Sequence, residues 1–286
     1  MIRIIDTLPQ AEALFDSEKF NKERWESYIN SIYDDSADIF KSDLQEYLQS
    51  GSYSFENDFL PIINAVPRHS SLYTLQTSFY KVTAGLNERV KECFLHEPDV
   101  DIVLYLGLCN GAGWVTNING RDVILLGIEK ILELNWYDED SMYGLIYHEL
   151  GHVYHKQFGT FHQHSDDNAS SFVWQLFTEG IAMYFEQALV GDFSYFHQNK
   201  DGWLKWCEDN FSQILEDFSH DLQAMTRFDQ RYFGDWVNYC GRSDVGYFLG
   251  AKFVQYLCGK LDFEQLIKIG IDEIYQEFVA FREKME

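Results

Sequence analysis

The residues of this chain best suited to chemistry form the pentapeptide His148-Glu149-Leu150-Gly151-His152. Residues four apart lie about 40° apart around an α-helix, so the two imidazoles would project side by side from adjacent turns. One metal ion could then bind both nitrogens. Glu149 would reach a water on that metal without being a ligand itself. This combination predicts hydrolysis by an activated water.

The flanking sequence predicts that the pentapeptide lies on a helix over residues 140–157. Asp138 or Ser141 is a suitable N-terminal cap, and Gly159 follows the expected end near Phe158. An apolar stripe recurs at helical spacing about 135° from the histidines, and it consists of Met142, Ile146, Leu150 and Val153. The expected helix therefore packs through one face and exposes its polar residues on another.

A third metal ligand is required, because a catalytic zinc site has three protein ligands and one open position for water. Residues 171–185 are almost wholly apolar and contain a single acid, Glu179. A carboxylate in such surroundings is seldom buried unless it is paired or bound to a metal. We therefore predict one zinc ion held by His148, His152 and Glu179. The alternative for Glu179 is an ordinary glutamate on a helix surface.

Three further histidines follow the pentapeptide. His155 lies one turn beyond His152, and His162 and His164 come after it. They are candidates for groups around the metal or for a second, adventitious site. Solvated side chains are the preferred interpretation.

The motif has a family resemblance. His148-Glu149-x-x-His152, followed on the next long helix by Thr178-Glu179-Gly180-Ile181-Ala182-x-Tyr184, resembles the gluzincin metallopeptidases, the thermolysin-like group in which a glutamate completes the zinc site. More narrowly, the chain is similar to a family of predicted zinc-dependent proteases of unknown substrate. In these a glycine-rich segment precedes the metal helix and a Gly-Tyr-x-x-Gly helix follows it, as residues 110–113 and 246–250 do here. The resemblance covers residues 100–258 and implies a zincin-like fold.

The resemblance also suggests a second catalytic residue and shows two departures. It aligns Tyr247 with the late tyrosine helix, so its hydroxyl is a candidate donor to the oxyanion; the alternative is a packing residue of a helix over residues 244–258. Met183 stands where thermolysin-like enzymes commonly place an acid that orients the first histidine. The segment 111–115 lacks the glutamate with which the aminopeptidase branch holds a substrate's amine. Endopeptidase and exopeptidase activity both stay open.

A substrate-binding edge is expected upstream of the metal helix. Residues 101–107 and 122–128 are predicted strands, and residues 111–120 a turn-rich loop. A hairpin beside the metal helix could add an extended peptide to its edge through main-chain hydrogen bonds. Gly111, Ala112 and Gly113 are therefore candidate substrate-binding residues. The alternative is a small sheet with a structural role only.

Composition and pattern set the expected architecture. The 286 residues, 46% hydrophobic and 17% aromatic, can build a sizeable core. Helical spacing dominates most of the chain outside the predicted strands. We expect an α+β, predominantly helical fold with a small β-sheet. An N-terminal helical layer would cover residues 1–97, and a zincin-like metallopeptidase core residues 98–286, packed as one unit.

Charge and cysteine usage favour some partners over others. The net charge of −24 disfavours nucleic acid and anionic membrane surfaces as partners. The five cysteines are scattered without a Cys-x-x-Cys pair, and no leader or long apolar run occurs, so we expect a soluble, cytoplasmic protein.

The favoured function is hydrolysis of peptides or proteins. The alternative is a catalytically silent, zinc-stabilised scaffold or peptide-binding protein, for which an intact Glu149 would be unnecessary.

Overall fold

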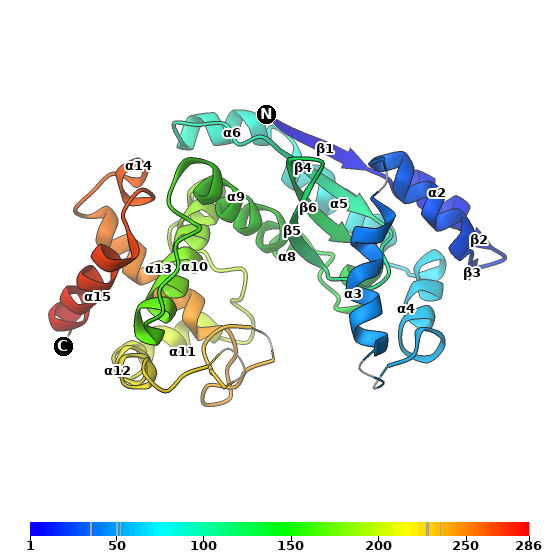
Figure 1. The fold of residues 1–286 in the computed structure, drawn as a ribbon. Helices are drawn as coiled ribbons and strands as arrows, with labels where there is room; N and C mark the ends of the chain where they lie inside the picture. The colour runs from blue at the N-terminus through cyan, green and yellow to red at the C-terminus, as the bar shows by residue number, and fades with distance from the viewer. Residues whose placement is uncertain (35, 50, 52, 227–228, 235, 286) are drawn as a thin grey trace. The chain divides into compact units, whose positions relative to one another are not determined.

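The computed structural model describes residues 1–34, 36–49, 51, 53–226, 229–234 and 236–285, apart from the side chains of residues 43, 46 and 47. The chain divides into two compact units, traced in Figure 1. The first comprises Met1–Glu88 and Glu97–Glu149, and the second Arg89–His96 and Leu150–Glu286. The division falls inside the segment predicted to carry the metal ligands. The expected division into an N-terminal helical layer over residues 1–97 and a zincin-like core over residues 98–286 stays a prediction.

The first unit is built on a four-stranded sheet with the order β1-β4-β6-β5. The strands are β1 (Ile2–Asp6), β4 (Val100–Tyr105), β5 (Gly113–Ile118) and β6 (Arg121–Gly127). β1 and β6 run parallel to β4, whereas β5 is antiparallel to β6. All six residues of β4 are buried, as expected for a central strand whose two faces are covered. β5 lies at one edge.

The predicted strands over residues 101–107 and 122–128 are confirmed as β4 and β6, but their predicted pairing and the predicted loop between them are wrong. Residues 111–120, expected to form a loop, contain β5. Its hairpin with β6 turns at Asn119-Gly120, where both residues have positive φ. Asn-Gly suits a two-residue hairpin turn of this kind, so the signal was present in the sequence. β4 and β6, expected as the two arms of a hairpin, are parallel neighbours, and β1 was not predicted.

Helices and one short hairpin complete the first unit. The helices are α1 (Leu8–Ala11), α2 (Lys22–Ile32), α3 (Ala37–Gln49), α4 (Leu60–Ala65), α5 (Leu72–Thr83), α6 (Leu86–Cys93), α7 (Ile128–Glu133) and α8 (Glu139–Tyr143), of which α6 extends into the second unit. The hairpin joins β2 (Phe15–Asp16) and β3 (Lys19–Phe20). Trp25 on α2 is fully buried and donates its indole N–H to the Leu106 carbonyl at 2.8 Å, which fixes α2 beside the end of β4.

The second unit is helical. Its helices are α9 (Glu149–Phe158), α10 (Asn168–Val190), α11 (Trp203–Asp209), α12 (Phe211–Asp221), α13 (Val245–Cys258), α14 (Phe263–Leu266) and α15 (Ile271–Met285). α10 is its central helix, packed against α13 and α15. The Asp167 carboxylate caps its start, and Gly191 ends it in the left-handed conformation. A helix that is apolar almost all round belongs in a core, which is where α10 lies.

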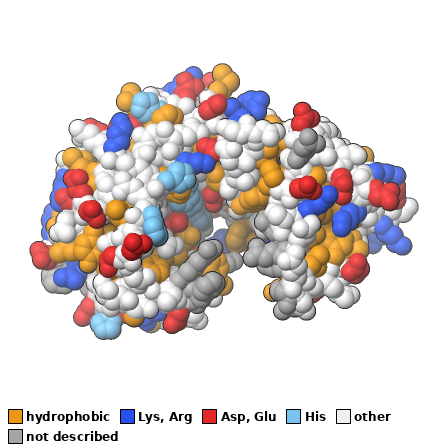
Figure 2. Space-filling model, in the orientation of Figure 1, with side chains coloured by type: hydrophobic (Ala, Val, Ile, Leu, Met, Phe, Trp, Pro, Cys, Tyr) orange, Lys and Arg blue, Asp and Glu red, His pale blue; other side chains and the backbone are white. Residues whose placement is uncertain are grey.

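The expectation of an α+β, mainly helical fold with a small sheet is confirmed, and the sheet is mixed. The acidic residues behind the net charge of −24 form no single patch on the face shown in Figure 2, where they are interspersed with lysine and arginine. None of the helices in the described part of the chain is both long and apolar enough to span a membrane.

Candidate metal centre

The pentapeptide lies on a helical segment that runs from Glu139 to Phe158 and changes its winding in the middle. α8 passes into a π-helical turn, Gly144–His148, and α9 follows from Glu149. The Asp138 carboxylate caps the start by accepting the Ser141 N–H at 2.8 Å. The predicted helix over residues 140–157 is therefore confirmed. A π-helical turn adds a residue to one turn and is frequent at functional sites; this one ends on His148.

The predicted apolar stripe anchors this segment. Its four members, Met142, Ile146, Leu150 and Val153, are fully buried. In the first unit the Tyr147 hydroxyl also donates to the Val82 carbonyl at 2.8 Å, which ties the π-helical turn to α5. The polar residues face elsewhere: His148 is buried, and Glu149 and His152 are half-buried. The segment is held through one face, as expected, and presents its donor atoms from another.

The structure brings His148, His152 and Glu179 together. One donor atom from each residue lies within 4.8 Å of the others, and His152 Nε2 is 3.2 Å from Glu179 Oε2. Two ligands of a tetrahedral zinc ion, at bond lengths of about 2.0–2.1 Å, lie about 3.4 Å apart. The His152–Glu179 pair therefore already has the spacing of two ligands on one ion. Two imidazoles and one carboxylate form a possible metal-binding triad.

Small residues set how closely the helices of the second unit approach beside these ligands. A Cβ on Gly151 would lie 2.8 Å from the Ala182 Cα, so α9 and α10 meet backbone to backbone. A Cβ on Gly180 would collide with the Gly250 carbonyl oxygen, where α10 crosses α13. Real Cβ atoms do not approach this closely. Gly151, next to His152, and Gly180, next to Glu179, therefore have a packing role that was not predicted from the sequence.

His155 corrects one expectation. It is fully buried, with the rings of Phe161, Trp174 and Phe177 at 5.5, 5.9 and 5.6 Å from its own. Burial lowers its pKa to about 3, so the imidazole is neutral. A step of three residues from His152 rotates the side chain by about 60°, which turns it onto the face packed against α10. The prediction of a solvated side chain is therefore wrong for His155, whereas it is confirmed for His162 and His164, which are exposed.

Phe161 was missed by the sequence analysis. Its ring makes an edge contact with His152, with the centroids 5.7 Å apart. Two hydrogen bonds hold the loop that carries Phe161. The Trp174 indole N–H donates to the Phe161 carbonyl at 3.3 Å, and the Thr160 N–H donates to the Ile267 carbonyl at 2.9 Å. The aromatic ring beside the candidate ligand His152 thus comes from a loop, where neither helical nor strand periodicity of apolar residues occurs. No signal in the sequence pointed to it.

The most deeply buried acid of α10 is Glu186, not Glu179. Its side chain is fully buried, and both carboxylate oxygens lie 2.9 Å from His197 Nδ1. Burial lowers the pKa of His197, but the Glu186 carboxylate outweighs that effect and the pKa is raised overall. Met183, at the position where an orienting acid was considered, is fully buried.

The remaining candidate residues lie elsewhere. Tyr247 lies in the first turn of α13, half-buried, with its ring 5.9 Å from that of Phe233. Gly113 opens β5 and lies against the π-helical turn, because a Cβ there would be 2.8 Å from Leu145 Cδ2. The carbonyl of Ala112 accepts the Gly127 N–H at 3.1 Å, and a Cβ on Gly111 would make ordinary van der Waals contact with Trp114 Cδ1 at 3.6 Å. Their roles in catalysis and substrate binding stay predictions.

The His148-His152-Glu179 triad is distinctive within this chain. Among the described residues, no other group of three histidine, cysteine or carboxylate side chains converges in this way. Comparisons with protein-family models, curated proteins and solved structures found no match to the chain. The chemistry of the site itself therefore carries the functional proposal.

Proposed function

We propose that this protein is a zinc-dependent metallopeptidase with a zincin-like core. The observation that carries the proposal is the convergence of His148, His152 and Glu179, with Glu149 beside them on the metal-binding helix. Imidazole and carboxylate donors suit zinc, and three of them with an open position are typical of catalytic rather than structural sites. A structural site would also have no need of the carboxylate of Glu149.

In the proposed reaction the zinc ion would supply a Lewis acid, and the protein would supply the group that transfers the proton. Zn²⁺ held by the triad would supply a Lewis acid that lowers the pKa of a water to about 7 and polarises a carbonyl group. Glu149 accepts the proton of the attacking water and returns it to the leaving amine. It follows His148 directly, so its side chain is rotated by about 100° from that ligand. This position is separate from the ligand face, and Glu149 is proposed to reach the water from it.

The edge of the sheet supports a peptide as the substrate. β5 is the last strand in the order β1-β4-β6-β5, and among the described strands it pairs with β6 alone. Its first residue, Gly113, lies against Leu145 in the turn that ends on His148. An extended peptide added to β5 would gain main-chain hydrogen bonds whatever its sequence. Gly111, Ala112 and Gly113 would line the start of that edge.

Tyr247 is proposed as the donor to the oxyanion. It lies one turn before Gly250, which meets α10 at Gly180, the residue after Glu179. A hydroxyl placed at the developing negative charge contributes about a hundredfold in rate. Tyr247→Phe should therefore lower kcat by about that factor and leave the zinc content unchanged. Full turnover in this variant would remove Tyr247 from the mechanism.

The test of the function pairs elemental analysis for zinc with cleavage of a peptide library, with and without chelator. We expect close to one zinc per chain and cleavage that chelator abolishes. Glu149→Gln should keep the zinc and lose turnover by at least about a thousandfold, because the proton acceptor is gone. Asp140→Asn, at an exposed residue in the first turn of α8, is the matched control and should keep both.

The other outcomes are equally informative. Zinc without cleavage in the wild-type protein would contradict the peptidase and favour a catalytically silent zinc-stabilised scaffold. Cleavage that survives in Glu149→Gln would contradict the role of this residue. Absence of zinc after reconstitution would overturn the whole proposal.

A further inference from the structure

The second unit contains a groove that shares no residue with the candidate metal centre. It lies among α11, α12, α13 and α15 and has a volume of about 470 Å³. Its walls are mostly aromatic, and they include Phe211, Phe248, Tyr256 and Phe281. Sites for small molecules in proteins commonly have about 300–1,000 Å³ and a mainly apolar lining with a few polar groups. The groove has the size and the lining of such a site.

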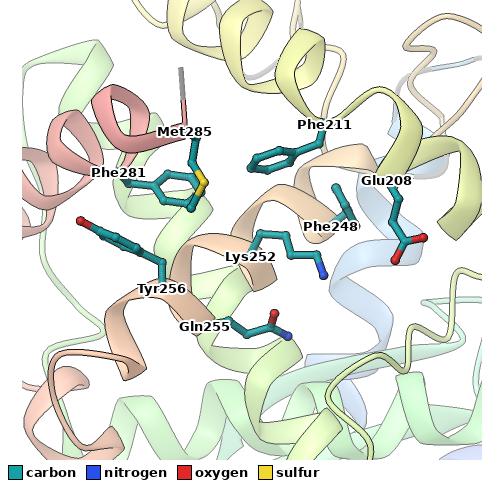
Figure 3. A pocket seen from close by; sticks show the side chains of 8 residues that line it. All are labelled: Glu208, Phe211, Phe248, Lys252, Gln255, Tyr256, Phe281 and Met285. Atoms are coloured by element: carbon teal, nitrogen blue, oxygen red, sulfur yellow. The ribbon is translucent and has the colours of Figure 1, made fainter.

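Two charged side chains of opposite sign line the same groove. They are Lys252 from α13 and Glu208 from α11, and Figure 3 shows both extending to one side. Phe281 and Met285, from α15, lie on the opposite side in this view. Phe211 and Phe248 lie on the same side as the two charges in this view, so charged and aromatic side chains line the groove together.

Neither charge has an ion-pair partner among the described residues, and Glu208 is exposed whereas Lys252 is half-buried. Among the described residues, Lys252 and Glu208 form no ion pair within 4.0 Å, either with each other or with a third residue. The Lys252 ammonium instead lies 5.3 Å from the centre of the Phe248 ring. Lys205 pairs with Asp209 and Lys260 with Glu277, whereas Lys284 resembles Lys252: it lies 5.0 Å from the Tyr256 ring and has no ion pair among the described residues. Lys252 is half-buried in a chain with 46 acidic and 22 basic residues.

We propose that this groove binds a small zwitterion with a large apolar side chain, such as an aromatic amino acid or an apolar dipeptide. Lys252 binds its carboxylate, Glu208 binds its ammonium group, and the apolar side chain packs against Phe211 and Phe281. A simple anion would be repelled by Glu208, and a simple cation by Lys252. A ligand with both charges can pair with both residues. Peptide hydrolysis releases molecules of this class, but the inference rests on the groove alone.

The first experiment measures binding by isothermal titration calorimetry with the full chain and L-phenylalanine as the probe. Three analogues each remove one feature: N-acetyl-L-phenylalanine the ammonium group, phenethylamine the carboxylate, and glycine the side chain. We expect L-phenylalanine to bind at least tenfold more tightly than each analogue. Equal binding of N-acetyl-L-phenylalanine would overturn the zwitterion and indicate an anion site. Lack of binding by L-phenylalanine and by the dipeptide L-leucyl-L-phenylalanine would overturn the site.

Charge-swapped variants test the two named residues. Lys252→Glu and Glu208→Lys should each weaken binding of L-phenylalanine at least tenfold, because each leaves two like charges in the groove. The double variant restores one charge of each sign and should recover much of the loss. Lys268→Gln, at an exposed lysine outside the groove, is the control and should bind normally. Lys252→Met replaces Lys252→Glu if the latter unfolds, and wild-type affinity in that variant would overturn the assignment.

A last comparison separates this inference from the proposed function. Binding should be the same with and without chelator and in Glu149→Gln, because the groove shares no residue with the triad. Binding that disappears with the metal would place the amino acid at the metal centre and overturn the groove as its site. Binding that persists in a protein without peptidase activity would leave this inference intact and contradict the proposed function alone.

Discussion

Asp101 in the sheet unit and Glu179 in the helical unit are both acids in apolar surroundings, but their neighbours differ in kind. The Asp101 side chain is fully buried and contacts the guanidinium groups of Arg3 and Arg121 and the hydroxyl of Tyr33. The Glu179 side chain is 17% exposed and faces the imidazole of His152. Guanidinium and hydroxyl groups satisfy a carboxylate permanently, whereas imidazoles share it with a metal. The convergence of two imidazoles with one carboxylate, and not the depth of burial, separates the candidate ligand from the structural acid.

Glu129 extends the comparison. It is fully buried at the start of α7 and accepts the backbone N–H groups of Gly107 and Cys109, each at 2.9 Å. Burial raises its pKa in spite of these hydrogen bonds. Like Glu186 with His197, Glu129 is more deeply buried than Glu179 but belongs to no triad of ligands. Apolar surroundings alone would have ranked these acids above Glu179.

The largest expected effect comes from removing the ligand carboxylate. Glu179→Gln should weaken zinc binding by about a thousandfold, because each ligand of a zinc site contributes several kcal/mol. The zinc-free protein should unfold at nearly the wild-type denaturant concentration, because the glutamine keeps the size of the side chain. Chelator competition measures the first quantity and urea unfolding the second. Unchanged zinc affinity would show that Glu179 is not a ligand.

The opposite pattern is expected for the structural acid. Asp101→Asn should lower the free energy of unfolding by about 3 kcal/mol, because Arg3 and Arg121 lose their buried partner. Zinc stoichiometry should not change. Urea unfolding and elemental analysis on the same preparation give both values. A loss of zinc without a loss of stability would reverse the comparison between the two acids.

A smaller effect is expected from the packing that brings α9 and α10 together. Gly151→Ala should cost about 2 kcal/mol of stability, because its Cβ would press on the Ala182 backbone. Zinc should also bind more weakly, since the contact lies beside His152. Gly111→Ala is the matched control, because the nearest atom to its Cβ would be 3.6 Å away. Equal zinc affinity in both variants would show that helix spacing does not govern the triad.

The smallest effect concerns acid pH. Burial raises the pKa of Asp101, but hydrogen bonds from Arg3, Tyr33 and Arg121 outweigh it, so the pKa is lowered overall. A lowered pKa contributes stability that is complete above the unfolded value of about 3.9 and is lost as pH falls towards the folded pKa. Stability should decline by up to about 1.4 kcal/mol per pH unit there. Asp101→Asn should flatten this decline, and an unchanged acid slope would contradict it.

The sequence by itself determined the local part of this site. The spacing of His148 and His152 fixes their shared helix face, and the apolar stripe fixes which side of that helix is buried, because both depend only on helical periodicity. Glu179 was found because a single acid in an apolar segment is chemically unusual. The mainly helical α+β class also followed from periodicity.

Only the tertiary structure decided the contacts between distant segments. Glu179 comes to 3.2 Å from His152, which lies 27 residues earlier, where Gly151 lets α9 and α10 meet. Packing against α10 also buried His155, and the pairing of β1 with β4 joined segments about 100 residues apart. Such contacts depend on which surfaces fit once the chain has collapsed, and helical or strand periodicity carries no information about that.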